Sequence, residues 1–287
     1  MKPLIPSPIL APDAAVDLQM HTTYSDGKWT AEQLIDYLVS EQFGLVAITD
    51  HDRVDTAAVL QQLAVEKQLP ILAAVEMSTS WRGESTDVLC YGFDPAKNEL
   101  QGLTQAIARR QRENTREVWE NLRQQGISFP HQHELAALLK KPSAQHLNEL
   151  IALLNKHGDG TGEPLAEKLI MDAGFFWATN DIAAVVDAAH GSGAVCLIAH
   201  PGRGEWWTCY DEHLLDELRQ EVPIDGFEAH YPAHTPEQTA LYLSYAQKHN
   251  LLVSSGSDSH GPDNKPIKYR AELSRNLLER LGIQVKS

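Results

Sequence analysis

The sequence has few cysteines and no long apolar run. Only three of its 287 residues are cysteine, Cys90, Cys196 and Cys209, and none of them forms a CxxC pair. This excludes a disulfide framework and a zinc knuckle, so we expect a reducing location, the cytoplasm. No apolar run reaches the roughly 18 residues of a membrane-spanning helix. The first residues, MKPLIPSPILAPDAA, contain four prolines and one lysine, which is atypical of a signal peptide.

Basic residues are scarce relative to acidic ones. There are 24 Lys and Arg against 39 Asp and Glu, so the formal net charge is −15. A protein that holds duplex DNA on a broad basic face is therefore excluded. A small phosphorylated substrate is compatible with this charge, because bound metal ions reverse the local field. The absence of a P-loop and of a GxSxG motif disfavours a nucleotide-cradling loop and a serine hydrolase.

Short apolar runs alternate with longer helical patterns, which predicts an α/β fold with a mostly parallel sheet or barrel. A closed or nearly closed (βα) barrel is the first expectation, and a doubly wound open sheet is the alternative. Thr30 and Gln33 form a predicted capping box, and Asn180 is the predicted cap of a helix over 182–189. The strand-like runs are 16–20, 45–49, 70–77, 88–93, 194–199, 224–229 and 251–254.

The alternation stops after Gly126. Residues 97–125 have the pattern of a long charged helix, and residues 127–178 that of several short helices without a clear strand. We therefore expect a barrel formed by residues 14–126 and 179–287. The segment 127–178 is the predicted helical insertion, a lid over the barrel rim.

Histidines and carboxylates follow the predicted strands, and the chain has 13 histidines. In parallel barrels and open α/β sheets, ligands bind at the carboxyl ends of the strands. Imidazole and carboxylate together suit Zn²⁺, Mn²⁺ or Fe²⁺, and their number suggests more than one ion. A multinuclear site of this kind can hold a phosphoryl group and deprotonate water. These residues are His21, Asp26, Asp50, His51, Asp52, Glu76, His200, Glu228, His230, Asp258 and His260.

Six segments resemble, in order, the motifs of the polymerase and histidinol phosphatase (PHP) family. The resemblance is closest to stand-alone members that act on nucleotides or RNA ends. It implies a distorted (βα)7 barrel and a metal-dependent phosphoesterase whose substrate is a nucleotide or a short RNA end. The segments are DLQMHTTYSDG (17–27), AITDHD (47–52), AAVEMS (73–78), IAHPGR (198–203), GFEAHYPAHT (226–235) and GSDSHGP (256–262).

The resemblance also implies roles for individual residues. It implies two or three divalent ions, with Mn²⁺, Zn²⁺ or Fe²⁺ expected and Mg²⁺ as a further candidate. One ion would be held by His21, Glu76 and Asp258. A second would be held by Glu76 as a bridge and by His200, and a third by Asp26, His51 and His260. The implied catalytic residues are His51, His200 and His260. The implied phosphate-binding residues are Arg203, His234 and Arg112, the last in a run with Arg109 and Arg116.

Two positions depart from the family pattern. Gln19 stands where the family usually has the first histidine of His-x-His, and a glutamine carbonyl is a poor ligand for a transition metal. Asp87 stands where many relatives carry a metal-binding histidine; as a ligand it would favour Mn²⁺ or Mg²⁺. These departures leave two alternatives open. One is a non-catalytic binding or regulatory domain with degenerate metal ligands, and the other is a metal-dependent amidohydrolase.

Overall fold

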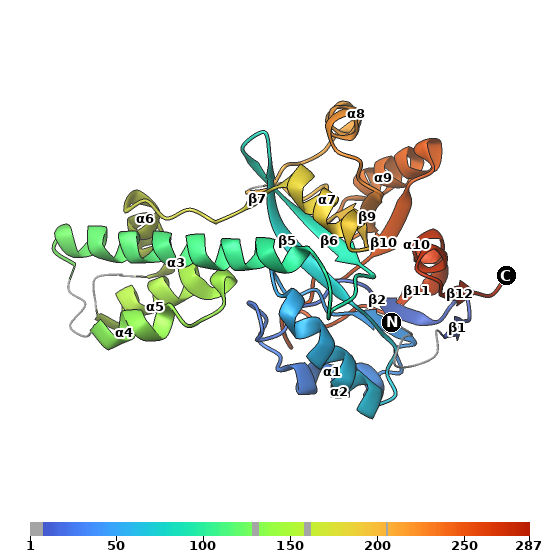
Figure 1. The fold of residues 1–287 in the computed structure, drawn as a ribbon, viewed down its shortest axis with the longest axis horizontal. Coiled ribbons are helices and arrows are strands. Elements are labelled where there is room, and N and C mark those ends of the chain that lie inside the picture. Colours follow the sequence, from blue (N-terminus) through green and yellow to red (C-terminus); the bar gives the residue numbers. More distant parts are fainter. Residues whose placement is uncertain (1–7, 128–131, 158–161, 205) are drawn as a thin grey trace. The chain divides into compact units, whose positions relative to one another are not determined.

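The computed structural model describes residues 8–127, 132–157, 162–204 and 206–287. The chain divides into two compact units, one formed by Met1–Thr104 with Thr179–Ser287 and the other by Gln105–Ala178. The first unit contains the sheets and the second is helical (Figure 1). The segment 127–178, expected as an insertion, lies within the helical unit. Among the helices of the described residues, none is both long and apolar enough to cross a membrane.

The strands of the first unit confirm a mixed α/β fold. They form a six-stranded sheet of order β10-β9-β8-β6-β5-β7, a four-stranded sheet of order β11-β2-β3-β4, and a β1-β12 pair. The strands are β1 (Ile9–Leu10), β2 (Ala15–Asp17), β3 (Leu45–Ala47), β4 (Ile71–Leu72), β5 (Ala74–Trp81), β6 (Glu84–Tyr91), β7 (Asn180–Asp181), β8 (Val195–Ile198), β9 (Gly226–His230), β10 (Leu252–Ser255), β11 (Tyr269–Arg270) and β12 (Gln284–Val285).

The predicted parallel pairing is only partly correct. β6 runs antiparallel to both of its neighbours, β5 and β8. The reason is a tight hairpin between β5 and β6, in which Arg82 and Gly83 both have positive φ, 53° and 89°. Two such residues suit a turn whose twist matches the flanking strands. The run 70–77, predicted as one strand, is divided between β4 and β5, which belong to different sheets.

The two larger sheets are linked near the ends of their strands. Parallel bridges join Met20 to Ser259 and His51 to Glu76. In the described residues the strands pair into separate sheets, so a closed (βα)7 barrel is not confirmed. The bridges nevertheless bring the segments that follow β2, β3 and β10 together with β5. This is the region in which the sequence places the histidines and carboxylates.

The helices begin where the sequence supplies caps. The box of Thr30 and Gln33 is present as predicted, and Thr235 and Gln238 form a second one. The cap of α7 is Asp181 and not Asn180, because the Asp181 side chain accepts a hydrogen bond from the Ala184 amide, whereas the Asn180 side chain donates to the Leu103 carbonyl oxygen. The helices are α1 (Ala31–Ser40), α2 (Ala57–Glu66), α3 (Leu100–Gln124), α4 (Gln132–Leu138), α5 (His146–His157), α6 (Glu163–Asp172), α7 (Ile182–Gly191), α8 (Glu212–Glu221), α9 (Pro236–His249), α10 (Arg275–Arg280) and the 3₁₀ turns η1 (Val54–Thr56), η2 (Ser143–Gln145) and η3 (Ala271–Ser274).

Both faces of the six-stranded sheet are covered. Cys90 and Cys196 point into a core shared with helices α7, α8 and α9, whereas Leu89 and Leu197 point into a second core. Helix α7 contacts β5 and β8, and α9 contacts β9 (Figure 1). Burial on both faces explains why these strands are nearly continuous apolar runs. The helical unit has its own apolar core, which includes Trp119, Leu150 and Ile170.

Candidate metal centre

Three groups of potential metal ligands overlap in the sheet-containing unit. In each group the ligand atoms lie within 4.8 Å of one another. His21 belongs to two of the groups and so does Glu76, so the groups form one continuous cluster. The groups are His21, Asp26, His51 and His260; His21, Glu76 and Asp258; and Glu76, Asp87 and His200.

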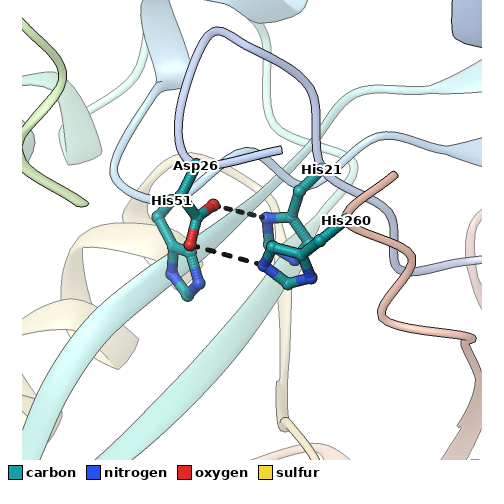
Figure 2. A group of neighbouring side chains, drawn as sticks. All are labelled: His21, Asp26, His51 and His260. Carbon is teal, nitrogen blue, oxygen red and sulfur yellow. Dashed lines mark ion pairs between the residues drawn. The ribbon is translucent and has the colours of Figure 1, made fainter. Parts of the chain in front are cut away.

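The first group surrounds Asp26. Figure 2 shows its carboxylate facing the imidazoles of His21 and His260, which stack on each other, with His51 on its other side. One Asp26 oxygen lies 3.7 Å from His21 Nδ1 and the other 3.4 Å from His260 Nε2. His260 Nδ1 lies 2.8 Å from the Asp258 carbonyl oxygen. If Nδ1 carries the proton for this hydrogen bond, the Nε2 lone pair faces Asp26 and is available to an ion.

Glu76 joins the other two groups. His21 Nε2 lies 3.1 Å from Glu76 Oε2 and 3.1 Å from Asp258 Oδ1. The other Glu76 oxygen, Oε1, lies 3.1 Å from His200 Nε2, which is 3.9 Å from Asp87 Oδ2. Ligand atoms at about 2.0–2.2 Å from one ion are themselves about 3 Å apart. The two Glu76 oxygens therefore face two different sets of ligands, as a bridging carboxylate requires.

Several buried polar atoms in the cluster fit a bound cation. His51 Nδ1, His200 Nδ1 and Gln19 Oε1 are buried without a hydrogen-bond partner. Leaving such an atom unpaired costs about 1–3 kcal/mol. Lone pairs of imidazole nitrogen and amide oxygen gain an electrostatic partner when a cation binds next to them. The donor set of nitrogen and oxygen atoms thus fits the group that the sequence predicts.

The charges of the cluster are strongly coupled. Burial opposes ionisation of Asp26, but the neighbouring imidazoles of His51, His260 and His21 hold its pKa well below the usual range. Burial likewise opposes protonation of His51, but Glu76 and Asp26 raise its pKa to about 9. Protonated imidazoles here stand where a divalent cation would supply the positive charge. Ion binding is therefore expected to release protons.

Local sequence explains how these side chains are held. The buried carboxylate of Asp50 accepts hydrogen bonds from the Thr22 amide and hydroxyl and from the Ser25 hydroxyl, which fixes the loop between His21 and Asp26. A side chain at position 27 would place its Cβ 2.4 Å from the His21 carbonyl oxygen, so only glycine fits there. His200 and Asp258 have positive φ, 31° and 53°. Strained backbone of this kind persists where surrounding contacts enforce it.

The two departures from the family pattern are both held by hydrogen bonds. Gln19 Nε2 donates to Glu76 Oε2 at 2.8 Å, and Trp207 Nε1 donates to Asp87 Oδ2 at 2.5 Å. The pKa of Asp87 is raised, first by burial and then by the negative charge of Glu76. Nothing in the sequence singles out the Asp87–Trp207 pair. The only signal for it is that Trp207 follows the strand-like run before His200.

The predicted phosphate-binding residues lie in different surroundings. Arg203 Nη1 donates to Asp258 Oδ2 at 3.3 Å, and its guanidinium lies 3.8 Å from the centre of the Trp207 ring. His234 is occupied by backbone groups: Nε2 accepts from the Gly202 amide at 3.0 Å, and Nδ1 lies 3.2 Å from the Ala229 carbonyl oxygen. His234 thus supports the turn that carries Arg203. Arg112 is exposed on α3, in the helical unit.

Tyr231 is a further residue at the centre that sequence reasoning missed. Its hydroxyl donates to Asp258 Oδ2 at 3.3 Å, the same oxygen that Arg203 contacts. Tyr231 directly follows His230 in the fifth motif, and that position is the only signal for it in the sequence.

Comparison with known proteins supports the same class. No protein-family model matches the chain. It is 26% identical to the 3′,5′-nucleoside bisphosphate phosphatase of Chromobacterium violaceum over 87% of the chain and 88% of that protein. It is 28% identical to the 5′-3′ exoribonuclease Rnm of Salmonella typhimurium over 86% of the chain and 85% of that protein. A solved structure of a metal-dependent phosphoesterase from Bifidobacterium adolescentis has the same fold, with a TM-score of 0.75 and 23% identity over 96% of this chain and 98% of that one.

These findings confirm the resemblance to the PHP family that the six motifs indicate. They also agree with the predicted class of enzyme, a metal-dependent phosphoesterase.

Proposed function

We propose that the chain is a metal-dependent phosphoesterase that hydrolyses a phosphate ester of a nucleotide or a short RNA end. The observation that carries the proposal is the overlap of three ligand groups through His21 and Glu76. A single isolated group would fit a structural ion equally well. Overlapping groups fit adjacent ions, which are typical of phosphoryl-transfer sites. The names of the relatives support phosphoester hydrolysis as the reaction.

Divalent ions in such a site lower the pKa of a coordinated water and neutralise charge on the phosphoryl group. The residues of the chain supply the rest. Glu76, whose two oxygens face different ligand sets, would hold two neighbouring ions. Arg203 lies beside Asp258 and can form charge-assisted hydrogen bonds to phosphate oxygens.

His200 and His260 differ in exposure. The His200 side chain is 2% exposed and bound between Glu76 and Asp87, whereas the His260 side chain is 33% exposed. His260 Nδ1 lies against the Asp258 carbonyl oxygen, so Nε2, which faces Asp26, is the nitrogen that would bind an ion. We therefore assign ligand roles to His51, His200 and His260.

The seven strands β2, β3, β5, β6, β8, β9 and β10 supply the scaffold. We propose that they act as one distorted barrel, because the bridges at Met20 and His51 connect the edges of the two larger sheets. The segments after the carboxyl ends of the parallel strands would then share one rim, where catalytic residues lie in barrel enzymes. The net charge of −15 favours a small phosphorylated substrate over a long duplex.

The proposal is tested with a substrate panel on the purified full chain. The panel contains a nucleoside 3′,5′-bisphosphate, a short 5′-phosphorylated RNA and histidinol phosphate, each with Mn²⁺, Zn²⁺ or Mg²⁺. We expect metal-dependent release of phosphate or of a mononucleotide from at least one nucleotide substrate. Absence of hydrolysis with every metal, in a protein that binds less than one ion per chain, would instead establish a non-catalytic domain. Cleavage of amides alone would establish an amidohydrolase.

A further inference from the structure

The six-stranded sheet brings two cysteines together away from the candidate metal centre. Cys90 and Cys196 lie opposite each other on the antiparallel strands β6 and β8, and their sulfur atoms are 3.7 Å apart. Both residues are fully buried. Cys196 is the second residue of β8, whereas the candidate metal centre uses His200, beyond the end of that strand. The cysteines thus belong to a separate part of the sheet.

An imidazole and a carboxylate lie next to Cys196. His190 lies in the last turn of helix α7, and Asp225 immediately precedes β9. His190 Nε2 lies 2.8 Å from Asp225 Oδ2, and the same oxygen accepts a hydrogen bond from the Cys196 amide at 2.7 Å. Ligand atoms of His190, Cys196 and Asp225 lie within 4.8 Å of one another. His190 and Asp225 are 34% and 23% exposed, so the group is open to solvent on one side.

We propose that this group is a second metal site, for a thiophilic divalent cation such as Zn²⁺. Packing of a buried thiol does not require an imidazole and a carboxylate beside it. The proposed ligands are Cys196, His190 and Asp225, whose ligand atoms lie together. Since His190 and Asp225 are partly exposed, a water molecule can supply the fourth ligand of a tetrahedral ion.

The chemistry of the ligands selects the ion. The Cys196 thiol loses its proton to solvent when its sulfur binds, so one ion displaces one proton and gains one thiolate. Thiolates favour Zn²⁺ strongly over Mg²⁺ and Mn²⁺. The bound ion would connect α7, β8 and the start of β9, and its binding free energy would add to the stability of the fold. The site is independent of the proposed phosphoesterase function.

Cobalt absorption tests the proposal without any activity measurement. Metal-free full-length protein, kept reduced with a phosphine, is titrated with Co²⁺. We expect a thiolate-to-cobalt charge-transfer band in the near ultraviolet that saturates at one Co²⁺ per chain, and that Zn²⁺ but not Mg²⁺ removes. The candidate metal centre offers only nitrogen and oxygen ligands, so it gives no such band. Cys196→Ser should abolish the band, and Cys209→Ser should leave it unchanged.

His190→Gln provides a variant that does not disturb the core. We expect it to weaken Co²⁺ binding at this band by about tenfold or more, while His213→Gln on the exposed side of α8 has no effect. Four outcomes would overturn the proposal: no band in the unmodified protein, a band that survives in Cys196→Ser, a band lost in Cys209→Ser, or unchanged affinity in His190→Gln. A Cys90–Cys196 disulfide that persists in the reduced preparation would overturn it as well.

Discussion

The Asp26 side and the Asp87 side of the candidate metal centre differ in what holds their carboxylates. Asp26 is surrounded by three imidazoles, which lower its pKa well below the usual range. Asp87 lies beside the negatively charged Glu76 in a buried position, and its pKa is raised. Its firmest contact is the indole N–H of Trp207, a neutral donor. An ion on the Asp26 side therefore meets a charged carboxylate and displaces protons from the imidazoles around it. An ion on the Asp87 side meets a carboxylate whose charged form is disfavoured and which already accepts a hydrogen bond from Trp207.

This difference indicates unequal affinity on the two sides. The Asp26 side keeps every ligand that the family resemblance implies, namely Asp26, His51 and His260. Away from the Asp26 side, Gln19 replaces a histidine and donates its amide to Glu76 Oε2, the oxygen that faces His21, instead of offering a nitrogen lone pair. Amide and carboxylate oxygens are weaker ligands than imidazole for transition metals. We expect the Asp26 side to fill first.

Removal of all ions should have the largest effect. Chelation followed by dialysis should reduce phosphoester hydrolysis to the uncatalysed background, because the lysine- and arginine-poor site cannot neutralise a phosphoryl group alone. Re-addition of Mn²⁺ should restore activity in two phases, which calorimetry should resolve as a tight and a weaker class of binding. A chelated protein that retains full turnover would contradict both the metal-dependent mechanism and the difference in affinity between the two sides.

Loss of a ligand on the Asp26 side should rank second. His51→Ala should lower kcat/KM by more than about 100-fold, since even residues that only orient a metal ligand contribute about 10- to 100-fold. The matched control is His213→Ala, which removes an exposed imidazole from α8 and should leave the rate unchanged. Metal analysis of both variants should show fewer bound ions only in His51→Ala. Wild-type activity in His51→Ala would show that the Asp26 side takes no part in hydrolysis.

The sequence predicted much of this arrangement because the relevant signals are local. Capping at Thr30, the apolar strand runs and the motif around Asp26 depend on neighbours in the chain. Pairing of β6 depends instead on a hairpin turn at Arg82 and Gly83, which reverses a strand that the alternation placed in parallel. Asn180 was predicted as a cap because its contact with the Leu103 carbonyl oxygen, 77 positions away in the chain, cannot be read from one sequence.

The contacts that distinguish the two sides of the centre were also invisible in the sequence. Trp207 lies 120 positions from Asp87 along the chain, and only the fold brings them together. The two contacts of His234 with backbone groups could not be predicted either, since one of them depends on the turn at Gly202. The chemical types of the ligands could thus be predicted, whereas their supporting partners could not.

Restoring the family residue on the Asp87 side should have an intermediate effect. Asp87→His should lower the Mn²⁺ or Zn²⁺ concentration for half-maximal activity by about tenfold, because imidazole is a better ligand for these ions. Asp87→Asn is the control: it retains an acceptor for the Trp207 N–H but cannot ionise, so it should raise that concentration. If both substitutions leave the metal dependence unchanged, Asp87 is not a ligand and the two sides are not comparable.

The smallest effect is expected where the Asp87 side meets the phosphate-binding arginine. Trp207 donates to Asp87 and stacks on Arg203, so it connects the ligand set with the group that would contact substrate. Trp207→Phe keeps a ring under the guanidinium but removes the N–H donor. Since an exposed cation–π contact contributes about 0.5–1 kcal/mol, Trp207→Ala should raise KM by about two- to fivefold with kcat little changed. Trp207→Phe should recover most of that KM while still shifting the metal dependence, because only the Asp87 hydrogen bond is lost. A fall in kcat alone in both variants would mean that Trp207 does not position Arg203 and serves only the ligand side.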